Sequence, residues 1–148
     1  MDEIDKKILN IIQTDFPVEA EPFEVLGEKI GISEDEALKR VRKLKDDGII
    51  RRIGAVFDTG KLGFASTLCA ARVPEERIKK FVETVNSYPG VTHNYRRNHE
   101  YNIWFTFMAP TEDEIKRSLT EIGEKTGITD ILNMPAKRKF KIDVSFDF

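Results

Sequence analysis

The two histidines of this 148-residue chain, His93 and His99, lie six residues apart in the stretch GVTHNYRRNHEYNIWF (residues 90–105). The same stretch contains two arginines, two tyrosines and the only tryptophan of the chain. Imidazole groups exchange protons near neutral pH or bind iron, and guanidinium groups bind carboxylates through paired hydrogen bonds. Aromatic rings stack on flat surfaces. The stretch therefore has the chemistry to bind a large, flat ligand that carries several carboxylates.

Two predicted strands must position these groups. Residues 91–97 and 101–108 are rich in β-branched and aromatic residues, and His99 lies in the short turn between them. Side chains alternate between the two faces of a strand. The two expected faces of the first strand are Val91, His93, Tyr95 and Arg97, and Thr92, Asn94 and Arg96. Only one of the two arginines would then reach a given ligand, unless a β-bulge intervenes.

The register of this hairpin stays open. A three-residue turn pairs Arg97 with Tyr101 and places His93 opposite Phe105, whereas a turn longer or shorter by one residue moves His93 opposite Trp104 or one of its neighbours. Each residue type also has a purely structural use, because aromatic residues favour strands and a lone histidine often serves only as a hydrogen-bonding group. It is the combination in one hairpin that favours a functional site.

Three helices and a small hairpin are predicted for residues 1–58. Apolar residues recur at helical spacing in three segments, residues 3–14, 23–30 and 34–47. Ser33 and Glu36 favour a capping box at the start of the third helix. The segment IIRRIGAVFD, residues 49–58, favours two short strands bent at Gly54. This order predicts a winged helix-turn-helix domain.

Residues 59–148 are predicted to form a second domain, which begins with the turn TGKLG. Helices are expected to begin at Pro74 and at Thr111, where Glu114 completes a capping box. Strand and helix signals follow the order β-α-β-β-α-β, which is typical of a ferredoxin-like fold. The final strand is expected in the segment ILNMPAKRKFKIDVSFDF (residues 131–148), where apolar residues alternate at Phe140, Ile142, Val144 and Phe146. The predicted fold class is therefore α+β.

The composition limits the classes of protein that fit. Hydrophobic residues make up 40% of the chain, which is enough to build cores. No apolar run approaches the roughly 20 residues of a membrane span, and the charged start MDEIDKK is not a secretory signal, so no membrane association is expected. Cys69 is the only cysteine and lies in an apolar run, so we expect a buried thiol in a protein of the reducing cytoplasm.

Nearly the whole chain resembles the Lrp/AsnC family of transcription regulators, through DEIDKKILNIIQ, EKIGISEDEALKRVRKLKDDGIIRRIGAVFD and KLGF. The resemblance implies a helix that enters the major groove of DNA and a sheet domain that dimerises and binds a small molecule. That helix begins Glu34-Asp35-Glu36, and residues 1–57 hold 10 Lys and Arg against 13 Asp and Glu, a net charge of −3. DNA binding is therefore not expected. Acidic residues also stabilise the first turn of any helix, so a regulator remains the alternative function.

A second resemblance is more specific. HNYRRNHEYNIWF, with NMPAKRKFKI downstream, resembles the siroheme decarboxylases of the alternative haem and nitrite-reductase haem pathways, whose subunits are Lrp/AsnC-like. This resemblance implies that two acetate side chains of siroheme lose carbon dioxide and become methyl groups, which gives didecarboxysiroheme. Siroheme, an iron tetrapyrrole, would be bound as the substrate, and no cofactor would be required. The expected partner is a homologous second subunit or a second copy of this chain.

Roles for the hairpin residues follow from this resemblance. His93 is the first candidate for acid–base catalysis because a strand holds it, and His99 is the second candidate. Either histidine is also a candidate ligand to the substrate iron, and no metal is expected to be held by the protein alone. The expected substrate-binding residues are Tyr95, Arg96, Arg97, Tyr101, Asn102 and Trp104, of which Arg97 is favoured over Arg96. The run Lys137, Arg138 and Lys139 either binds further carboxylates or is a solvated charged end. A catalytically silent subunit that supports an active homologue is a further interpretation.

Overall fold

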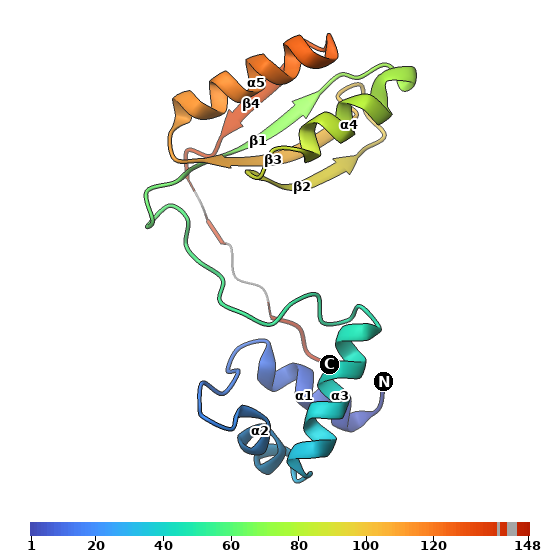
Figure 1. Cartoon of the computed structure of the whole chain (residues 1–148), viewed down its shortest axis with the longest axis vertical. Coiled ribbons are helices and arrows are strands. Elements are labelled where there is room, and N and C mark those ends of the chain that lie inside the picture. Colours follow the sequence, from blue (N-terminus) through green and yellow to red (C-terminus); the bar gives the residue numbers. More distant parts are fainter. Residues whose placement is uncertain (139, 142–144) are drawn as a thin grey trace. The chain divides into compact units, whose positions relative to one another are not determined.

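The computed structural model describes residues 1–138, 140–141 and 145–148, and its chain divides into two compact units (Figure 1). One unit comprises Met1–Ala55 with Lys141–Phe148, and the other comprises Val56–Phe140. Each unit has its own hydrophobic core, so each is described by itself. Among the described residues, none of the helices combines the length and the apolar composition that a membrane-spanning segment needs.

The first unit is a bundle of three helices, as predicted. They are α1 (Glu3–Ile12), α2 (Pro22–Ile30) and α3 (Glu34–Asp46). Their apolar stripes meet in a core whose buried members are Ile8, Leu9, Leu26, Val41, Leu44 and Ile50. The end of the chain packs on the same unit, because the Gln13 side-chain amide donates to the Phe146 carbonyl oxygen (2.7 Å) and accepts from the Phe146 backbone N–H (2.9 Å).

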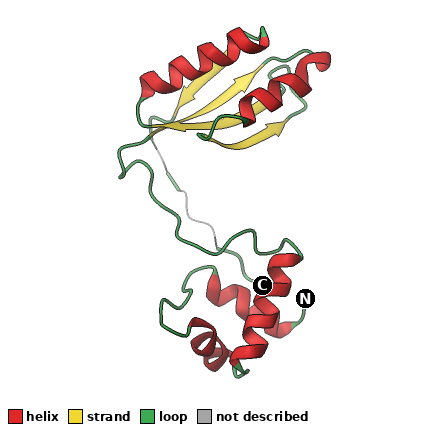
Figure 2. Ribbon diagram, in the orientation of Figure 1, coloured by secondary structure: helices red, strands yellow, loops and turns green. Residues whose placement is uncertain are grey.

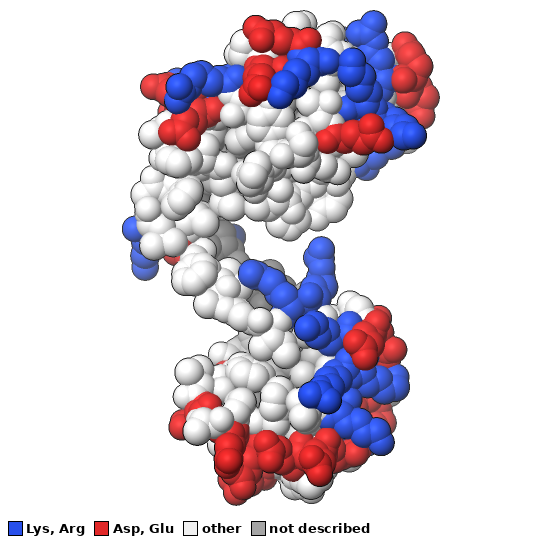
Figure 3. Space-filling view, viewed as in Figure 1, with Lys and Arg blue, Asp and Glu red and all other residues white. Residues whose placement is uncertain are grey.

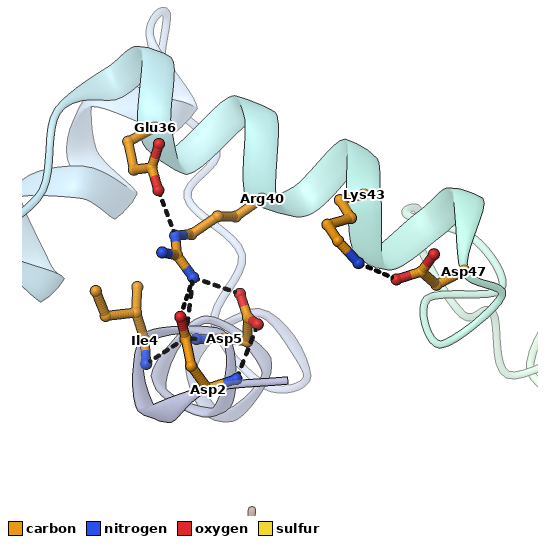
Figure 4. A network of polar contacts seen from close by, with 7 residues as sticks. All are labelled: Asp2, Ile4, Asp5, Glu36, Arg40, Lys43 and Asp47. Atoms are coloured by element: carbon orange, nitrogen blue, oxygen red, sulfur yellow. Dashed lines mark hydrogen bonds and ion pairs between the residues drawn. The ribbon is translucent and has the colours of Figure 1, made fainter.

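An ion-pair network connects α1 to α3 (Figure 4). The Arg40 guanidinium of α3 donates to the carboxylates of Asp2 (2.8 Å) and Asp5 (2.8 Å) at the start of α1, and to Glu36 one turn earlier on α3 (2.7 Å). The expected capping box of α3 is therefore half formed. Ser33 Oγ accepts from the Glu36 backbone N–H (3.3 Å), but the Glu36 carboxylate is bound by Arg40. A complete capping box forms instead between Asp2 and Asp5.

The two short strands expected in residues 49–58 are absent from the described structure. The segment is extended and irregular, with Gly54 at a φ of 157°. A β-bridge needs a partner strand at hydrogen-bonding distance, and the bend at Gly54 does not bring the two halves of this segment together. The prediction of a wing hairpin within this chain was therefore wrong, whereas the helix-turn-helix was right.

The second unit has the predicted β-α-β-β-α-β order. It contains β1 (Ala65–Ala71), a 3₁₀ turn η1 (Glu75–Arg77), α4 (Ile78–Asn86), β2 (Val91–Arg96), β3 (Ile103–Ala109), α5 (Glu112–Thr126) and β4 (Ile131–Pro135). The strands form one sheet in the order β2-β3-β1-β4, and every neighbouring pair is antiparallel. The final strand occupies the beginning of the segment expected for it and not the part where apolar residues alternate. Phe140 and Phe146 belong to no strand, and Ile142 and Val144 lie outside the described residues.

Both helices of this unit cover the same face of the sheet (Figure 2). The covered face carries the core, in which Phe81, Val85, Phe105 and Ile122 are fully buried. We call the opposite side the open face. Its residues are Ser66, Leu68 and Ala70 of β1, His93 and Tyr95 of β2, Trp104, Thr106 and Met108 of β3, and Leu132 and Met134 of β4.

Cys69 lies on the covered face and is fully buried, as expected. Burial raises the pKa of its thiol to about 12, because the apolar surroundings disfavour the thiolate. A thiol in this state is a poor nucleophile, which agrees with the interpretation of Cys69 as a small core residue.

Candidate active site

A four-residue turn fixes the register of the β2–β3 hairpin. The Arg97 backbone N–H donates to the Asn102 carbonyl oxygen (2.8 Å), so residues 98–101 form the turn. This turn is one residue longer than the three-residue case, and it places His93 opposite Thr106 and Tyr95 opposite Trp104.

The other end of the hairpin has a register that differs by one residue. The Met108 backbone N–H donates to the Gly90 carbonyl oxygen (2.8 Å), and a Cβ at Gly90 would lie 2.0 Å from the Met108 carbonyl oxygen. Only glycine allows the two backbones to approach this closely. The two registers meet at a β-bulge between Val91 and His93, so the extra residue is Thr92.

The bulge corrects the predicted faces of β2. Val91 pairs with Phe107 and packs on the covered core, whereas His93 pairs with Thr106 on the open face. Val91 and His93 therefore lie on opposite faces, although strict alternation placed them together. A single inserted residue reverses the alternation, which is why the sequence pattern alone could not place His93.

The open face of the hairpin brings together four of the expected site residues. The rings of His93 and Tyr95 lie nearly parallel, with centroids 6.0 Å apart and an interplanar angle of 28°. The Arg97 guanidinium lies over the Trp104 ring, 5.5 Å from its centroid. An imidazole, a phenol, an indole and a guanidinium thus share one surface. Tyr95 leaves 52% of its area exposed, so this surface is available to a ligand.

A hollow of about 310 Å³ adjoins His93 on the open face. It is lined by Ser66, Thr67, Leu68, Thr92, His93, Thr106, Met108, Met134 and Ala136. Inside it, His93 Nδ1 lies 3.0 Å from Thr92 Oγ1 and 3.4 Å from Thr106 Oγ1. Within the described part of the chain, Nε2 of the same ring makes no hydrogen bond.

The tip of the hairpin forms a second hollow, of about 500 Å³. It is lined by Arg96, Arg97, Asn98, His99 and Asn102. The His99 ring stacks on Tyr101 at 6.3 Å, and its Nδ1 accepts a hydrogen bond from the Tyr101 backbone N–H (3.1 Å). In the neutral ring the hydrogen therefore lies on Nε2. The expected histidines thus lie in separate hollows, although Arg97 belongs both to the tip and to the open face.

Arg72, which directly follows β1, contacts the tip of the β2–β3 hairpin. It was not identified from the sequence. Its guanidinium pairs with Glu100 (3.3 Å) and Asp130 (3.2 Å) and lies 5.1 Å from the centre of the Tyr101 ring. The Tyr101 hydroxyl also donates to Asp130 (2.9 Å). Arg72 is distant from the hairpin in sequence, so only the register of β1 against β3 could have pointed to it.

Four of the expected substrate-binding residues use their polar groups within the protein. Besides Tyr101, which donates to Asp130, the Trp104 indole N–H donates to the Tyr101 carbonyl oxygen (2.7 Å). Arg96 forms two hydrogen bonds with the Glu75 carboxylate (3.0 and 2.6 Å) on the covered side of the hairpin. The Asn102 side chain donates to the Val73 carbonyl oxygen (2.8 Å) and accepts from the Val73 N–H (3.0 Å). Arg97 has no such carboxylate partner among the described residues.

The basic run near the chain end is described only in part. The Arg138 guanidinium lies 5.0 Å from the centre of the Phe140 ring. Lys139 lies outside the described residues, so the role expected for this run stays a prediction.

Residues 5–51 match the family model of the siroheme decarboxylase NirDL-like HTH domain, and residues 61–141 match that of the AsnC-like ligand binding domain. The siroheme decarboxylase alpha subunit of Oleidesulfovibrio alaskensis is 56% identical over 146 residues, which cover 99% of this chain and 88% of that protein.

Solved structures include similar proteins of both kinds, a siroheme decarboxylase and an AsnC family regulator. The crystal structure of the siroheme decarboxylase NirDL in complex with an iron-uroporphyrin III analogue is 39% identical, with a TM-score of 0.67. The match covers 88% of this chain but only 43% of the NirDL chain. An AsnC family transcriptional regulator from Agrobacterium tumefaciens is 27% identical, with a TM-score of 0.80 over 99% of this chain. By its full-length identity to the alpha subunit and by the family models that match its two parts, the chain belongs to the siroheme decarboxylase family.

Proposed function

We propose that this chain is a subunit of a siroheme decarboxylase that converts two acetate side chains of siroheme to methyl groups. The observation that carries the proposal is the open face of the hairpin, where His93, Tyr95, Trp104 and Arg97 lie side by side. The aromatic rings suit one face of a tetrapyrrole, and the guanidinium suits one of its carboxylates.

The reaction sets requirements that this surface meets. Each acetate releases carbon dioxide, and the electrons of the broken carbon–carbon bond pass into the conjugated macrocycle. One proton per acetate must then reach the carbon that becomes the methyl group. We assign this proton transfer to His93, because imidazole exchanges protons near neutral pH and Nε2 of His93 makes no hydrogen bond within the described residues. In this reaction siroheme is the substrate, and no separate cofactor takes part.

His99 has the secondary role. It lies in the turn rather than in a strand, and its Nδ1 is engaged by the backbone, so Nε2 is the nitrogen that can meet the substrate iron or a carboxylate. Tyr95 and Trp104 would form the wall of the site, while Arg97 would bind a carboxylate. Three other residues would support the hairpin through contacts within the protein. Arg96 contacts Glu75, Tyr101 contacts Asp130, and Asn102 contacts Val73.

A second, homologous chain is part of the proposal. The hollow next to His93 measures about 310 Å³, and its floor is the open face, so a partner over this face would complete the enclosure. Two comparisons support this. A relative is named as an alpha subunit, which implies another subunit, and the NirDL chain is about twice as long as the part that matches.

The deciding experiment is anaerobic incubation with siroheme, followed by mass measurement of the tetrapyrrole. The chain is tested alone, together with a co-expressed homologous chain, and against the homologous chain alone. We expect the pair to remove the mass of two carbon dioxide molecules. Unchanged siroheme in all three incubations contradicts the proposal. Turnover by the homologous chain alone, at the rate of the pair, would make this chain a silent subunit.

The regulator alternative is not favoured. The first turn of α3 carries Glu34, Asp35 and Glu36, and Arg40 is bound by three carboxylates of its own unit. Acidic side chains gather along the lower edge of this unit, and the basic ones over the flank formed by α3 (Figure 3). Affinity for DNA depends on neutralising phosphates, and this mixed surface neutralises few of them.

A further inference from the structure

The β-bulge at Thr92 has a chemical consequence. In a regular strand, Thr92 and His93 would point to opposite faces of the sheet. The bulge instead brings the Thr92 hydroxyl to the His93 ring, next to Thr106 on the facing strand. Bulges often re-aim a side chain beside an active site.

The two hydroxyls form a continuous chain with the imidazole. Thr92 Oγ1 lies 2.7 Å from Thr106 Oγ1 and 3.0 Å from His93 Nδ1, and Thr106 Oγ1 lies 3.4 Å from the same nitrogen. Both threonines therefore face one nitrogen of the ring. The other nitrogen, Nε2, makes no hydrogen bond within the described residues.

A hydroxyl pair is suited to a residue that gains and loses protons. A hydroxyl oxygen accepts a hydrogen bond from a protonated ring nitrogen. When an imidazolium ring loses its proton from Nε2, Nδ1 keeps its hydrogen and can donate it to the same hydroxyl in both states. The pair can thus hold the ring in one orientation before and after a proton leaves Nε2.

We infer that Thr92 and Thr106 are positioning residues for His93, which anchor Nδ1 and make Nε2 the nitrogen that transfers protons. The inference rests on the proposed function, because it concerns the same histidine. In the transfer, the N–H bond at Nε2 breaks and a C–H bond forms on the substrate carbon. The hydrogen left on Nδ1 is donated to Thr92 Oγ1, and Nε2 then regains a proton from solvent.

The anchor can be tested without turnover, because the chain has only two histidines. Ring nitrogen-15 NMR of histidine-labelled protein in alkaline buffer reports which nitrogen carries the hydrogen in each neutral ring. Thr92→Val and Thr106→Val keep the side-chain shape and remove the hydroxyl. We expect both variants to shift the two His93 nitrogen signals and to leave those of His99 unchanged. His93 signals identical to the wild type would overturn the inference.

Kinetics then test the consequence for catalysis in the assembled enzyme. We expect kcat for Thr92→Val to fall about tenfold, the scale of one lost hydrogen bond to a functional group, while KM for siroheme changes little. Thr92→Ser should restore both kcat and the His93 signals, because serine supplies the same hydroxyl. A serine variant as slow as the valine variant would contradict a hydroxyl anchor.

Thr120→Val is the matched control. It removes a threonine hydroxyl that donates to the Lys116 carbonyl oxygen (3.1 Å) on α5, and it should change neither the His93 signals nor kcat. The two proposals fail in different ways. Shifted signals with wild-type kcat in the valine variants would keep the anchor and contradict catalysis by His93. Unshifted signals contradict the anchor whatever the rate.

Discussion

His93 and His99 are held in different ways, and this difference decides which of them suits proton transfer. His93 lies within β2, stacks on Tyr95 and contacts two threonine hydroxyls. His99 lies at the tip, where one backbone hydrogen bond and Tyr101 orient it. Proton transfer needs a donor placed within a few tenths of an ångström, so the strand residue is better suited.

We expect His93→Ala to keep the fold and the binding of siroheme while turnover falls roughly 10²–10⁴-fold, the usual contribution of a general acid or base. The measurement is the decarboxylation rate per folded, siroheme-loaded protein. If His93 only supports the sheet, the same variant loses about 1–3 kcal/mol of unfolding free energy and keeps its rate.

The same measurement on His99→Ala separates the two histidines. Its rate loss should be smaller than that of His93→Ala. If His99 binds the substrate iron, the absorption spectrum of the bound siroheme should change instead. A His99 variant that is slower than the His93 variant and spectrally unchanged would exchange the two roles.

Substitution of the two neighbouring arginines, Arg96 and Arg97, should change siroheme affinity to different extents. Arg97→Ala should weaken siroheme binding about 10–100-fold, as expected for losing a charged hydrogen bond. Arg96→Ala should weaken it less, because Arg96 is already paired with Glu75. Titration of siroheme absorbance against each variant gives both Kd values. Equal losses of affinity would show that Arg96 leaves Glu75 to bind substrate.

At the scale of elements, the hairpin shows what a sequence pattern can and cannot predict. Strand-forming residues predicted β2 and β3, and the structure brings the imidazole, the indole and one guanidinium of the candidate site together on the open face. The bulge was not predictable, because it arises from two registers set independently by the turn at residues 98–101 and by the close approach at Gly90. Such a mismatch is a property of the paired strands and of neither strand alone.

The wing was mispredicted, and the extent of the last strand could not be predicted, for a related reason. Alternation at Phe140 and Phe146 is a local signal, but a strand exists only where a neighbour supplies its hydrogen bonds. β1 pairs with Ile131–Pro135 instead. Helices were predicted more accurately because their hydrogen bonds lie within the segment itself. Asn102 and Arg72 depend on partners in other elements, which a single strand pattern does not reveal.

Asn102 should prove to be a structural residue of the hairpin. Its side-chain amide satisfies both the N–H and the C=O of Val73, so Asn102→Ala leaves two partly buried backbone groups unpaired. We expect a loss of about 1–3 kcal/mol in unfolding free energy. Trp104 fluorescence during urea unfolding follows this unit, because Trp104 is the only tryptophan. Asn98→Ala, at the exposed tip, is the control and should change stability by less than about 0.5 kcal/mol.

The ion-pair network between α1 and α3 should make the stability of the helical unit depend on pH. The backbone N–H of Asp5 and the Arg40 guanidinium hold the pKa of Asp2 below its ordinary value of 3.8. A lowered pKa means that the stabilisation is present above that ordinary value and is lost as pH falls through the folded-state pKa.

Asp2→Asn tests this, because asparagine keeps the helix cap and removes the charge. We expect a lower Tm than wild type at neutral pH, followed by circular dichroism, and a difference that shrinks in acid below about pH 4. A Tm difference that is constant from neutral pH into acid would show that Asp2 acts only as a cap.

At the scale of the whole molecule, the sheet unit is incomplete as a single copy. Its helices cover one face only, while Leu68 and Leu132 on the open face each leave 39% of their area exposed. In Figure 3 the charged side chains of this unit gather mainly over the helices and at one end, and the surface along the strands is mainly uncharged. An uncovered sheet face with exposed leucines usually contacts a partner. The candidate site lies on the same face, so assembly and catalysis depend on one surface.

We therefore expect a dimer that forms through the open face, either with a homologous chain or with a second copy. Sedimentation at micromolar concentration should give about twice the 17.0 kDa mass of the chain for the self-pair, or the summed mass with a homologue.

Leu132→Asp should weaken either pair, because a desolvated carboxylate in an apolar interface is costly. Leu132 does not line the hollow at His93, so the substitution leaves the residues that line this hollow unchanged. Thr120→Asp adds the same charge on α5 and should leave the mass unchanged. If Leu132→Asp sediments as the wild type does, the dimer uses another surface, and the hollow at His93 must be closed by something other than the partner proposed for it.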